Sequence, residues 1–477
     1  MSKPAMQLNH WIGGQSIEPG ARTYFDDRNP LDDSLYAVVA RGTAADVDRA
    51  VKTAHAAFAG YRKTLPKDRE AWLQRAASAM EAREREFLDI LIDEIGSPLQ
   101  KAKFEFGKAV SMMRAAAGMA RQVKGHTMPS DSPGRISLSV RQPIGVVAAI
   151  TPFNVPLIKG VRLSANPLAL GNTVVLLPSE QAPASATLLA EVYREAGIPD
   201  GAMNVVTGIG EEIGDTLTTH PHVAMVTFTG SSRVGKHIAV LCARHGKRVT
   251  LELGGKNPVV VLADADLDRT IPAVVHGIFT YQGQVCMGAS RIYVERPVFD
   301  DFIARFKRTA EALGMGDLRD PRTVIGPIIS ERQRARVRSH IEDAVAKGAA
   351  LVTGGTWENN RCRPTILAGV NDSMTVCRDE TFGPVTAVHA VENAEEALAR
   401  ANDSTYGLSA AVFTRSIDKA LPLAQGIAAG MVHVNSSPLQ DEPHVPFGGV
   451  GDSGVGREGT EADIEAMTEW KWITIQT

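Results

Sequence analysis

Short apolar runs alternate with helical runs over residues 144–262, and this alternation restricts the fold more than any other feature of the sequence. Strands that are apolar on both faces and separated by helices form parallel sheets covered by helices on both sides. We therefore predict a doubly wound α/β domain, which binds ligands at the carboxyl ends of its strands. The strand candidates are residues 146–150, 173–177, 203–206, 223–228 and 249–253.

A second block of the same texture follows Pro258, with loops rich in Gly and Pro at residues 380–384 and 446–456. Because 477 residues are too many for one ordinary core, we predict two α/β domains with a cleft between them. The strand candidates of the second block are residues 259–262, 292–294, 385–389, 411–413 and 431–434, and residues 470–475 predict a final strand.

The N-terminal part of the chain predicts amphipathic helices that carry no chemistry. Thr43 and Asp46 have the spacing of a capping box, so a helix is expected to begin there. Pro66 begins another helical region, which ends at Gly96, and a third helix is expected over residues 99–123.

The charge balance excludes some classes of partner. Lys and Arg number 51 against 54 Asp and Glu, a net charge of −3, which predicts neither nucleic-acid binding nor attraction to an anionic membrane. No apolar run has the length of a membrane span, and residues 1–4 (MSKP) lack the apolar core of a signal peptide. The cysteines are 242, 286, 362 and 377, without C-x-x-C spacing. This pattern argues against a disulfide framework or a metal site and fits the cytoplasm.

Cys286 is the candidate nucleophile. It lies among small residues between an apolar helical run at 271–281 and a β-like run at 291–294, a junction that a small molecule can reach. A thiolate is a strong nucleophile when its pKa is lowered or a base is near. A single cysteine is a weak signal, because most free cysteines are buried apolar filler.

Two polar residues near predicted strand ends suit the same chemistry. Glu252 precedes two glycines, and burial would raise its pKa toward that of a general base; the alternative is a half-exposed strand residue. Asn154 lies between two prolines after the strand ending at residue 150, where its amide can donate to an oxyanion. The alternative for Asn154 is a turn-forming role.

Residues 228–237 (FTGSSRVGKH) indicate a phosphate-binding site, because a strand end is followed by the start of a helix. The string nearly matches a nucleotide P-loop but has His237 where a hydroxyl is required, which favours a cofactor over nucleotide hydrolysis. An ordinary strand-to-helix turn is the alternative. Residues 208–213 lack the third glycine of a Rossmann fingerprint, and residues 451–455 lack the last glycine of a serine-hydrolase elbow.

Taken together and in this order, these stretches resemble the aldehyde dehydrogenase superfamily over nearly the whole chain. The most specific segments are residues 251–258 (LELGGKNP), 283–286 (GQVC), 380–384 (ETFGP) and 446–449 (PFGG). The resemblance implies two doubly wound parallel-sheet domains and a small β element that bridges to a neighbouring subunit in a homodimer or homotetramer. The implied ranges are 1–119 and 142–253 for the NAD-binding domain, 254–456 for the catalytic domain, and 120–141 with 457–477 for the bridging element.

The resemblance also implies a mechanism. Cys286 attacks the aldehyde, and the Asn154 amide with the Cys286 backbone N–H holds the oxyanion. Hydride transfer to the nicotinamide leaves a thioester, which Glu252 hydrolyses by activating water. Glu380 is implied to hold the nicotinamide ribose. The implied cofactor-binding residues are Thr151, Pro152, Glu180, Gly230, Ser231, Val234, Leu253, Gly254, Glu380 and Phe382.

Two positions depart from the family pattern. The usual Lys-Pro-Ser-Glu reads LPSE at residues 177–180, and the remaining Glu180 favours the free 2′-hydroxyl of NAD over the 2′-phosphate of NADP. Leu163 stands nine residues after Asn154, where many members carry a relay lysine. Glu458 matches the carboxylate of that relay but is expected to lack its partner.

The substrate prediction is an aromatic aldehyde. Arg162, Pro167, Met287 and residues 441–447 (DEPHVPF) are similar to the benzaldehyde, vanillin and salicylaldehyde dehydrogenase branch. A flat apolar slot would suit such a ring, unless its residues are plain packing. The predicted lining is Phe153, Val285, Met287 and Phe447. The alternatives are a short aliphatic aldehyde, a CoA-acylating enzyme, which commonly lacks the water-activating carboxylate, and a non-catalytic NAD-binding protein.

Overall fold

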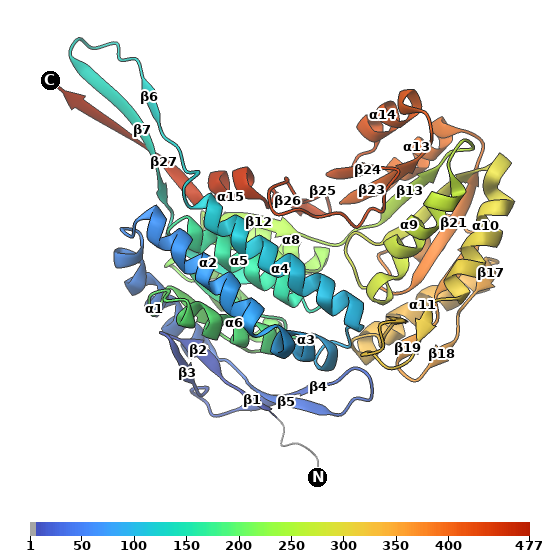
Figure 1. Ribbon diagram of the computed structural model, residues 1–477, viewed down its shortest axis with the longest axis horizontal. Helices are drawn as coiled ribbons and strands as arrows, with labels where there is room; N and C mark the ends of the chain where they lie inside the picture. Colours follow the sequence, from blue (N-terminus) through green and yellow to red (C-terminus); the bar gives the residue numbers. More distant parts are fainter. Residues whose placement is uncertain (1–5) are drawn as a thin grey trace.

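The computed structural model describes residues 6–477, which form two lobes and a projecting arm (Figure 1). Residues 1–4, whose sequence argues against a signal peptide, lie outside the described part of the chain. Within that part, no helix is both long enough and apolar enough to cross a bilayer. The fold is of the α/β class, with one large sheet in each lobe.

The first lobe is built around a sheet with strand order β26-β12-β11-β8-β9-β10-β2-β3. Its parallel strands lie where the alternating sequence pattern predicts them. They are β8 (Val146–Ile150), β9 (Thr173–Leu177), β10 (Met203–Val205), β11 (Val223–Thr229) and β12 (Arg248–Glu252). Antiparallel strands extend both edges: β2 (His10–Ile12), β3 (Gln15–Ile17) and β26 (Gly454–Val455).

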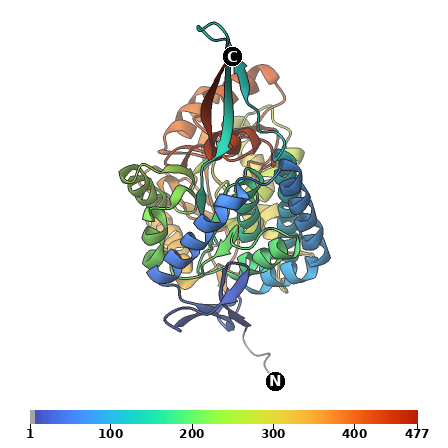
Figure 2. The same ribbon diagram turned by 90° about the vertical axis from the view of Figure 1, so that its left-hand side faces the viewer.

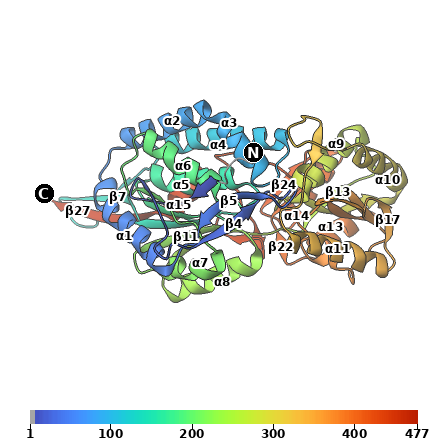
Figure 3. The same cartoon turned by 90° about the horizontal axis from the view of Figure 1, so that it is seen from below.

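Alternate residues of these strands enter two different apolar cores. Val147 and Leu176 belong to one core, and Ala148 and Val175 belong to the other. Successive strand residues point to opposite faces, so helices must cover both sides of the sheet, as Figure 3 shows. On the first face lie α2 (Pro66–Ala82), α3 (Glu84–Asp93), α4 (Leu99–Met119), α5 (Pro156–Ala169) and α6 (Ala184–Glu195); on the second lie α1 (Ala44–Tyr61), α7 (Gly210–Thr219) and α8 (Ser232–Arg244).

The N-terminal helices begin where local signals place them. The capping box of Thr43 and Asp46 starts α1, and Pro66 occupies the first position of α2. The region expected to run from Pro66 to Gly96 is divided between α2 and α3, and the helix expected over residues 99–123 ends at Met119.

The second lobe contains a sheet with strand order β17-β20-β21-β14-β13-β23-β24, parallel except for β17. Val259 and Val260 again enter different cores, so this sheet is also covered on both faces. The strands are β13 (Asn257–Val261), β14 (Ala289–Glu295), β17 (Ala350–Thr353), β20 (Thr365–Ala368), β21 (Val385–Val391), β23 (Ser409–Phe413) and β24 (Met431–Val434). The covering helices are α9 (Leu267–Phe279) and α10 (Arg296–Glu311) on one face, with α13 (Ala394–Asn402) and α14 (Ile417–Gly426) on the other.

The arm is a three-stranded antiparallel sheet that stands away from both lobes (Figures 1 and 2). The C-terminal strand β27 (Thr468–Gln476) pairs along its length with β7 (Arg135–Pro143), which also pairs with β6 (His126–Met128). Large apolar side chains are exposed on it: Ile136, Trp470, Trp472, Ile473 and Ile475.

Helix α11 (Glu331–Ala346) packs on β20 and β21 of the second sheet through a further apolar core. A separate small sheet is formed by β1 (Met6–Leu8), β5 (Leu35–Ala40) and β4 (Tyr24–Arg28). The remaining elements are short: β15 (Gly314–Met315), β16 (Thr323–Ile325), β18 (Trp357–Glu358), β19 (Arg361–Cys362), α12 (Thr375–Arg378), β22 (Tyr406–Gly407), β25 (Val450–Gly451) and α15 (Thr460–Met467). The domain ranges implied by the resemblance remain predictions. Strand β26, inside the range 254–456, pairs with β12 of the first sheet.

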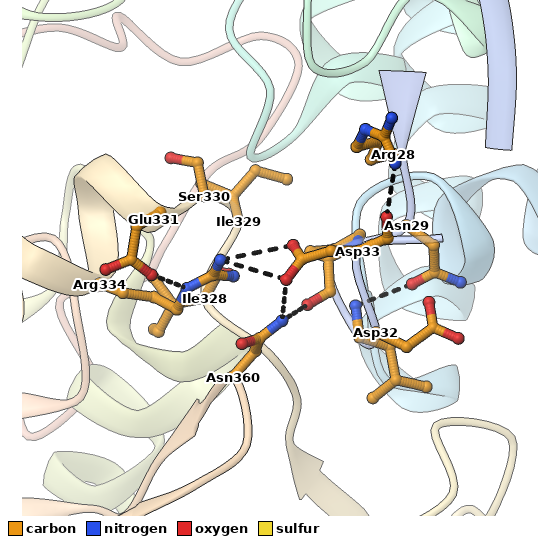
Figure 4. A network of polar contacts seen from close by, with 12 residues as sticks. Arg28, Asn29, Asp32, Asp33, Ile328, Ile329, Ser330, Glu331, Arg334 and Asn360 are labelled. Atoms are coloured by element: carbon orange, nitrogen blue, oxygen red, sulfur yellow. Dashed lines mark hydrogen bonds and ion pairs between the residues drawn. The ribbon is translucent and has the colours of Figure 1, made fainter. Parts of the chain in front are cut away.

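A polar network joins the turn between β4 and β5 to α11 of the second lobe (Figure 4). Arg334 donates from Nη2 to both carboxylate oxygens of Asp33 at 3.4 Å, and its Nε lies 2.8 Å from Glu331. Asn360 donates from Nδ2 to Asp33 at 3.1 Å and to the carbonyl of Pro30 at 2.9 Å. The segment just before α11 in turn contacts the loop that carries Cys286, through the Pro327 carbonyl and the Ile329 N–H.

Candidate active site

The loop that carries Cys286 is tightly constrained. The helix before it ends at Phe279, two residues short of the predicted end, because Tyr281 and Gln282 adopt left-handed φ values of 50° and 54° within the turn η1 (Thr280–Gly283). The Tyr281 hydroxyl donates to the carbonyl of Ile95 at 2.9 Å, and Gln282 Nε2 donates to the carbonyl of Pro327 at 2.9 Å. Contacts to both lobes therefore hold the turn that leads to the candidate nucleophile.

Asn257 fixes the backbone on the other side of Cys286. Its Nδ2 donates to the carbonyls of Cys286 at 2.7 Å and Gly288 at 3.0 Å, while its Oδ1 accepts from the backbone N–H of Ser409 at 3.0 Å. This residue ties the cysteine loop to the second sheet. Sequence reasoning missed its role, although Asn257 belongs to the segment LELGGKNP.

Asn154 follows β8 and its side chain reaches the cysteine loop. Its Nδ2 donates to the carbonyl of Gln284 at 2.9 Å, and its own backbone carbonyl accepts from Lys101 Nζ at 2.7 Å. The Gln284 side chain is itself held, since its Oε1 accepts from the N–H of Ile329 at 3.0 Å. An amide has two N–H donors, so one remains for a substrate oxygen.

Glu252 ends β12 and is 1% exposed. Burial raises the pKa of Glu252 to about 7, against the lowering effects of Lys159 and of the neighbouring Cys286 thiol. Neither carboxylate oxygen has a hydrogen-bond partner among residues 6–477. Burial and then the charge of Glu252 raise the pKa of the Cys286 thiol. A buried carboxyl group with a pKa near neutrality beside a thiol is suited to proton transfer.

The expectation that Glu458 lacks a basic partner is wrong. Lys159 Nζ lies 2.7 Å from Glu458 Oε2 and 3.6 Å from Glu252 Oε2, and Arg162 Nη1 lies 3.3 Å from Glu458. Lys159 is one helical turn before Leu163 on α5, so both positions lie on the same helix face. Burial alone would lower the pKa of Lys159, but the two carboxylates outweigh it and raise the pKa.

The predicted substrate residues fall into two groups. Phe153 meets Phe382 edge to face, with ring centroids 5.9 Å apart, and Val285 and Met287 are half-buried beside Cys286. Phe447 is instead almost fully buried, with Lys159 Nζ 4.8 Å and the Arg162 guanidinium 5.2 Å from its ring centre. Phe447 thus packs under the two cations.

Arg162 fastens the segment 441–447 to α5. Its two terminal nitrogens contact the Asp441 carboxylate at 3.0 and 2.9 Å, and Nη2 also donates to the carbonyl of Glu442 at 3.2 Å. A paired guanidinium–carboxylate contact defines the geometry of both partners. The segment that resembles aromatic aldehyde dehydrogenases is therefore anchored beside Glu458.

Residues predicted to bind the cofactor lie along the carboxyl-terminal edge of the first sheet, where its parallel strands end. Parallel strands β8, β9, β11 and β12 end there and place Thr151, Pro152, Glu180, Gly230 and Leu253 along it. Ser231 is exposed and caps α8, where its hydroxyl accepts from the N–H of Val234 at 3.5 Å. An open helix start beside a row of strand ends fits a dinucleotide with its pyrophosphate at that helix.

Glu380 approaches this edge from the second lobe. Its Oε1 accepts from the N–H of Gly255 at 3.0 Å, and a Cβ atom at position 254 would lie 2.5 Å from the Glu380 carboxylate. Only glycine permits that approach at Gly254. Burial raises the pKa of Glu380. A cleft beside it is lined by Val285, Thr381 and Phe382, which places the predicted ribose-binding carboxylate next to the cysteine loop.

Comparison with known proteins agrees with this geometry. The model of the aldehyde dehydrogenase family matches residues 17–473. A vanillin dehydrogenase of Pseudomonas fluorescens is 42% identical over 98% of this chain and 97% of its own, and a benzaldehyde dehydrogenase [NAD(+)] of Pseudomonas putida is 38% identical over 94% and 92%. The crystal structure of a salicylaldehyde dehydrogenase from Pseudomonas putida G7 with salicylaldehyde superposes with a TM-score of 0.96 at 36% identity, covering 99% of this chain and 98% of that one. The chain therefore belongs to the aldehyde dehydrogenase family and is an enzyme that oxidises aldehydes.

Proposed function

We propose that this enzyme oxidises an aromatic aldehyde to the carboxylic acid with NAD, through a thioester on Cys286. One observation carries the proposal: Cys286, Glu252 and Asn154 come from different elements and meet beside the edge suited to a dinucleotide, with a pKa of about 7 at Glu252. A nucleophile, a base and an oxyanion donor together are what acyl transfer requires.

The first half of the reaction forms a carbon–sulfur bond. Glu252 takes the proton of the Cys286 thiol, and the sulfur attacks the aldehyde carbon. The carbonyl oxygen becomes an oxyanion that accepts hydrogen bonds from the free N–H of the Asn154 amide and from the Cys286 backbone. When bound, NAD would supply the acceptor for the hydride that leaves the tetrahedral carbon, and a thioester would remain on Cys286.

The second half releases the acid. Glu252, once it has lost its proton, takes a proton from water, and the water oxygen attacks the thioester carbon. The carbon–sulfur bond breaks, and Cys286 leaves as a thiolate. Lys159 lies 3.6 Å from Glu252 and stabilises its ionised form, whereas the charge of Glu458, which pairs with Lys159 at 2.7 Å, raises the pKa of Glu252. Lys159 therefore takes the place of the relay lysine that many family members carry at the position of Leu163.

NAD is proposed rather than NADP because a carboxylate follows β9. Glu180 is half-buried at the carboxyl end of that strand, next to the start of α7 at Gly210. A carboxylate accepts a hydrogen bond from a 2′-hydroxyl and repels a 2′-phosphate. The name of the Pseudomonas putida benzaldehyde dehydrogenase also specifies NAD(+).

An aromatic substrate is supported by the names of the relatives and by the rings near Cys286. Phe153 and Phe382 meet edge to face, and Phe382 lines a cleft together with Val285. A short aliphatic aldehyde is the alternative substrate. The buried Glu252 supports hydrolysis over transfer of the acyl group to CoA, and the convergence of all three polar residues supports catalysis over NAD binding alone.

We further propose a homodimer or homotetramer built through the arm. The outer edge of β27 pairs with no strand among residues 6–477, and exposed Trp and Ile side chains surround it. Such an edge is a template for another chain. All four cysteines are free, which supports the proposed cytoplasmic location.

Absorbance of NADH tests the proposed activity. Benzaldehyde, vanillin and salicylaldehyde are compared with propanal and hexanal, and the acid product is identified. We expect a kcat/KM at least about tenfold higher for the aromatic aldehydes, the preference that about 1.4 kcal/mol of ring contact would give. Higher efficiency with the aliphatic aldehydes would refute the substrate class, and tight NAD binding without oxidation of any aldehyde would refute the enzyme.

A further inference from the structure

A buried ion pair on α4 has no role in the reaction described so far. Lys101 and Glu105 are one helical turn apart, and Lys101 Nζ lies 2.5 Å from Glu105 Oε2. Lys101 is 8% exposed and Glu105 is fully buried. Burying two charges costs several kcal/mol per ion, and an apolar pair of similar volume is often as stable. A contribution to the stability of α4 therefore does not explain why this ion pair is buried. The explanation lies in the contacts that Lys101 and Glu105 make outside α4.

Lys101 contacts both sides of the proposed oxyanion site. Its Nζ donates to the backbone carbonyl of Asn154 at 2.7 Å and lies 3.9 Å from the centre of the Tyr281 ring. Asn154 carries the amide proposed to hold the oxyanion. Tyr281 begins the left-handed turn that leads to Cys286. One ammonium group thus touches the residue that donates to the oxyanion and the loop that carries the nucleophile.

Glu105 accepts hydrogen bonds from free backbone N–H groups at the start of α5, the helix that follows Asn154. The residue before α5 is Val155, which has no side-chain acceptor, and Glu105 Oε1 accepts instead from the N–H groups of Leu157 at 2.9 Å and Ile158 at 3.4 Å. Free N–H groups and the helix dipole make this position favourable for a carboxylate. The pair therefore holds Asn154 by its carbonyl and the next helical turn by its N–H groups.

We propose that Lys101 and Glu105 are positioning residues for the oxyanion site, with Lys101 setting the place of Asn154 and Glu105 setting the start of α5. The inference rests on the proposed role of Asn154. Neither side chain touches the substrate. They act by holding the Asn154 amide where the oxyanion forms, so their effect falls on the step that makes the carbon–sulfur bond.

The rate of the first NADH burst, recorded by stopped flow, tests this role. Lys101→Met removes the ammonium and is expected to slow the burst about tenfold or more, because a small displacement of a catalytic group has effects of that order. The Kd for NAD should stay within about twofold, since the contacts of Lys101 are with Glu105, the Asn154 carbonyl and the Tyr281 ring, none of which is among the residues predicted to bind the cofactor. The matched control is Lys103→Met, an exposed lysine on the same helix, which should match the parent protein.

A double-mutant cycle with Asn154→Ala separates positioning from general damage. Asn154→Ala alone should slow the burst by about 10²–10³-fold, as loss of an oxyanion donor does. If Lys101 acts through Asn154, adding Lys101→Met should slow it by no more than about threefold further, whereas independent sites multiply their costs. Glu105→Gln, which keeps the size and the acceptor oxygen, is measured in the same cycle. It takes the place of Lys101→Met if that variant does not fold.

The outcomes distinguish this inference from the proposed function. Fully multiplicative costs for Lys101→Met and Glu105→Gln, or burst rates equal to that of the parent protein, would overturn the positioning role while leaving the oxyanion assignment intact. A parental burst rate for Asn154→Ala would instead overturn the oxyanion assignment. A slower burst in Lys101→Met and in Glu105→Gln, with no further slowing when either change is added to Asn154→Ala, would support the inference.

Discussion

Lys159→Met should move the pH dependence of catalysis in a defined direction. Lys159 Nζ lies 3.6 Å from Glu252 and lowers the pKa of Glu252, which burial raises to about 7. Glu252 acts as a base only when it is ionised, so the rate rises with pH through that pKa. Removing the ammonium group leaves only the smaller effect of the Cys286 thiol to oppose burial, so the acid limb should move to higher pH.

The size of the shift follows from the distances. Two unit charges about 4 Å apart interact by about 4 kcal/mol at an effective dielectric constant of ~20. Lys159 divides its charge between Glu252 and Glu458, and Arg162 remains 3.3 Å from Glu458 in the variant. We take about one third of the interaction, ~1.4 kcal/mol, which is about one pKa unit. The ionised fraction of Glu252 at about pH 7 then falls from about one half to about one tenth.

The assay is kcat for acid formation, measured from about pH 5.5 to 9.5 at saturating NAD and aldehyde. Lys159→Met should be about fivefold slower than the parent protein near pH 7 and within about twofold of it near pH 9. Lys159→Arg keeps the charge and should keep the acid limb, and Lys103→Met is the exposed control. An acid limb that stays in place or moves to lower pH in Lys159→Met would refute the coupling between Lys159 and Glu252.

Three further variants test the nucleophile, the cofactor and the arm. Cys286→Ala should lose at least about 10³-fold in kcat while its Kd for NAD changes by less than about twofold, measured by titration; remaining activity would exclude the nucleophile. Glu180→Ala should reduce the ratio of kcat/KM for NAD over NADP by about tenfold or more, and equal use of both by the parent protein would show that Glu180 does not discriminate. Ile473→Lys with Ile475→Lys should shift the mass measured by light scattering toward the monomer, whereas an unchanged mass would place the interface elsewhere.

The fold was predictable because its signals are local. Apolar β-branched runs such as residues 146–150 and 173–177 became strands with those bounds, and Thr43 with Asp46 began a helix. The end of the helix before Cys286 was missed, because the left-handed φ of Tyr281 depends on distant partners such as the carbonyl of Ile95. The sequence between residues 271 and 281 remains apolar and gives no sign of that turn.

The side chains that support the site were harder to predict, because their partners are far apart in the sequence. Lys159 and Glu458 are separated by 299 positions, and Lys101 and Asn154 by 53. In the family pattern, the relay lysine stands at the position of Leu163. Because this chain has no lysine there, Glu458 was expected to lack its partner. A helix brings positions 159 and 163 to the same face, so the charge is supplied one turn earlier than the pattern suggests.

Mass spectrometry of Glu252→Gln offers the most direct test of the proposed thioester. The variant should still transfer the first hydride, though more slowly because Glu252 no longer takes the thiol proton. It should hydrolyse the acyl group more slowly still, because the attacking water has no base. After mixing with NAD and benzaldehyde and quenching in acid, the peptide that contains Cys286 should gain the mass of a benzoyl group, and Cys286→Ala should gain nothing. A burst of NADH with Cys286 unmodified, or an acyl group on another residue, would contradict the thioester mechanism.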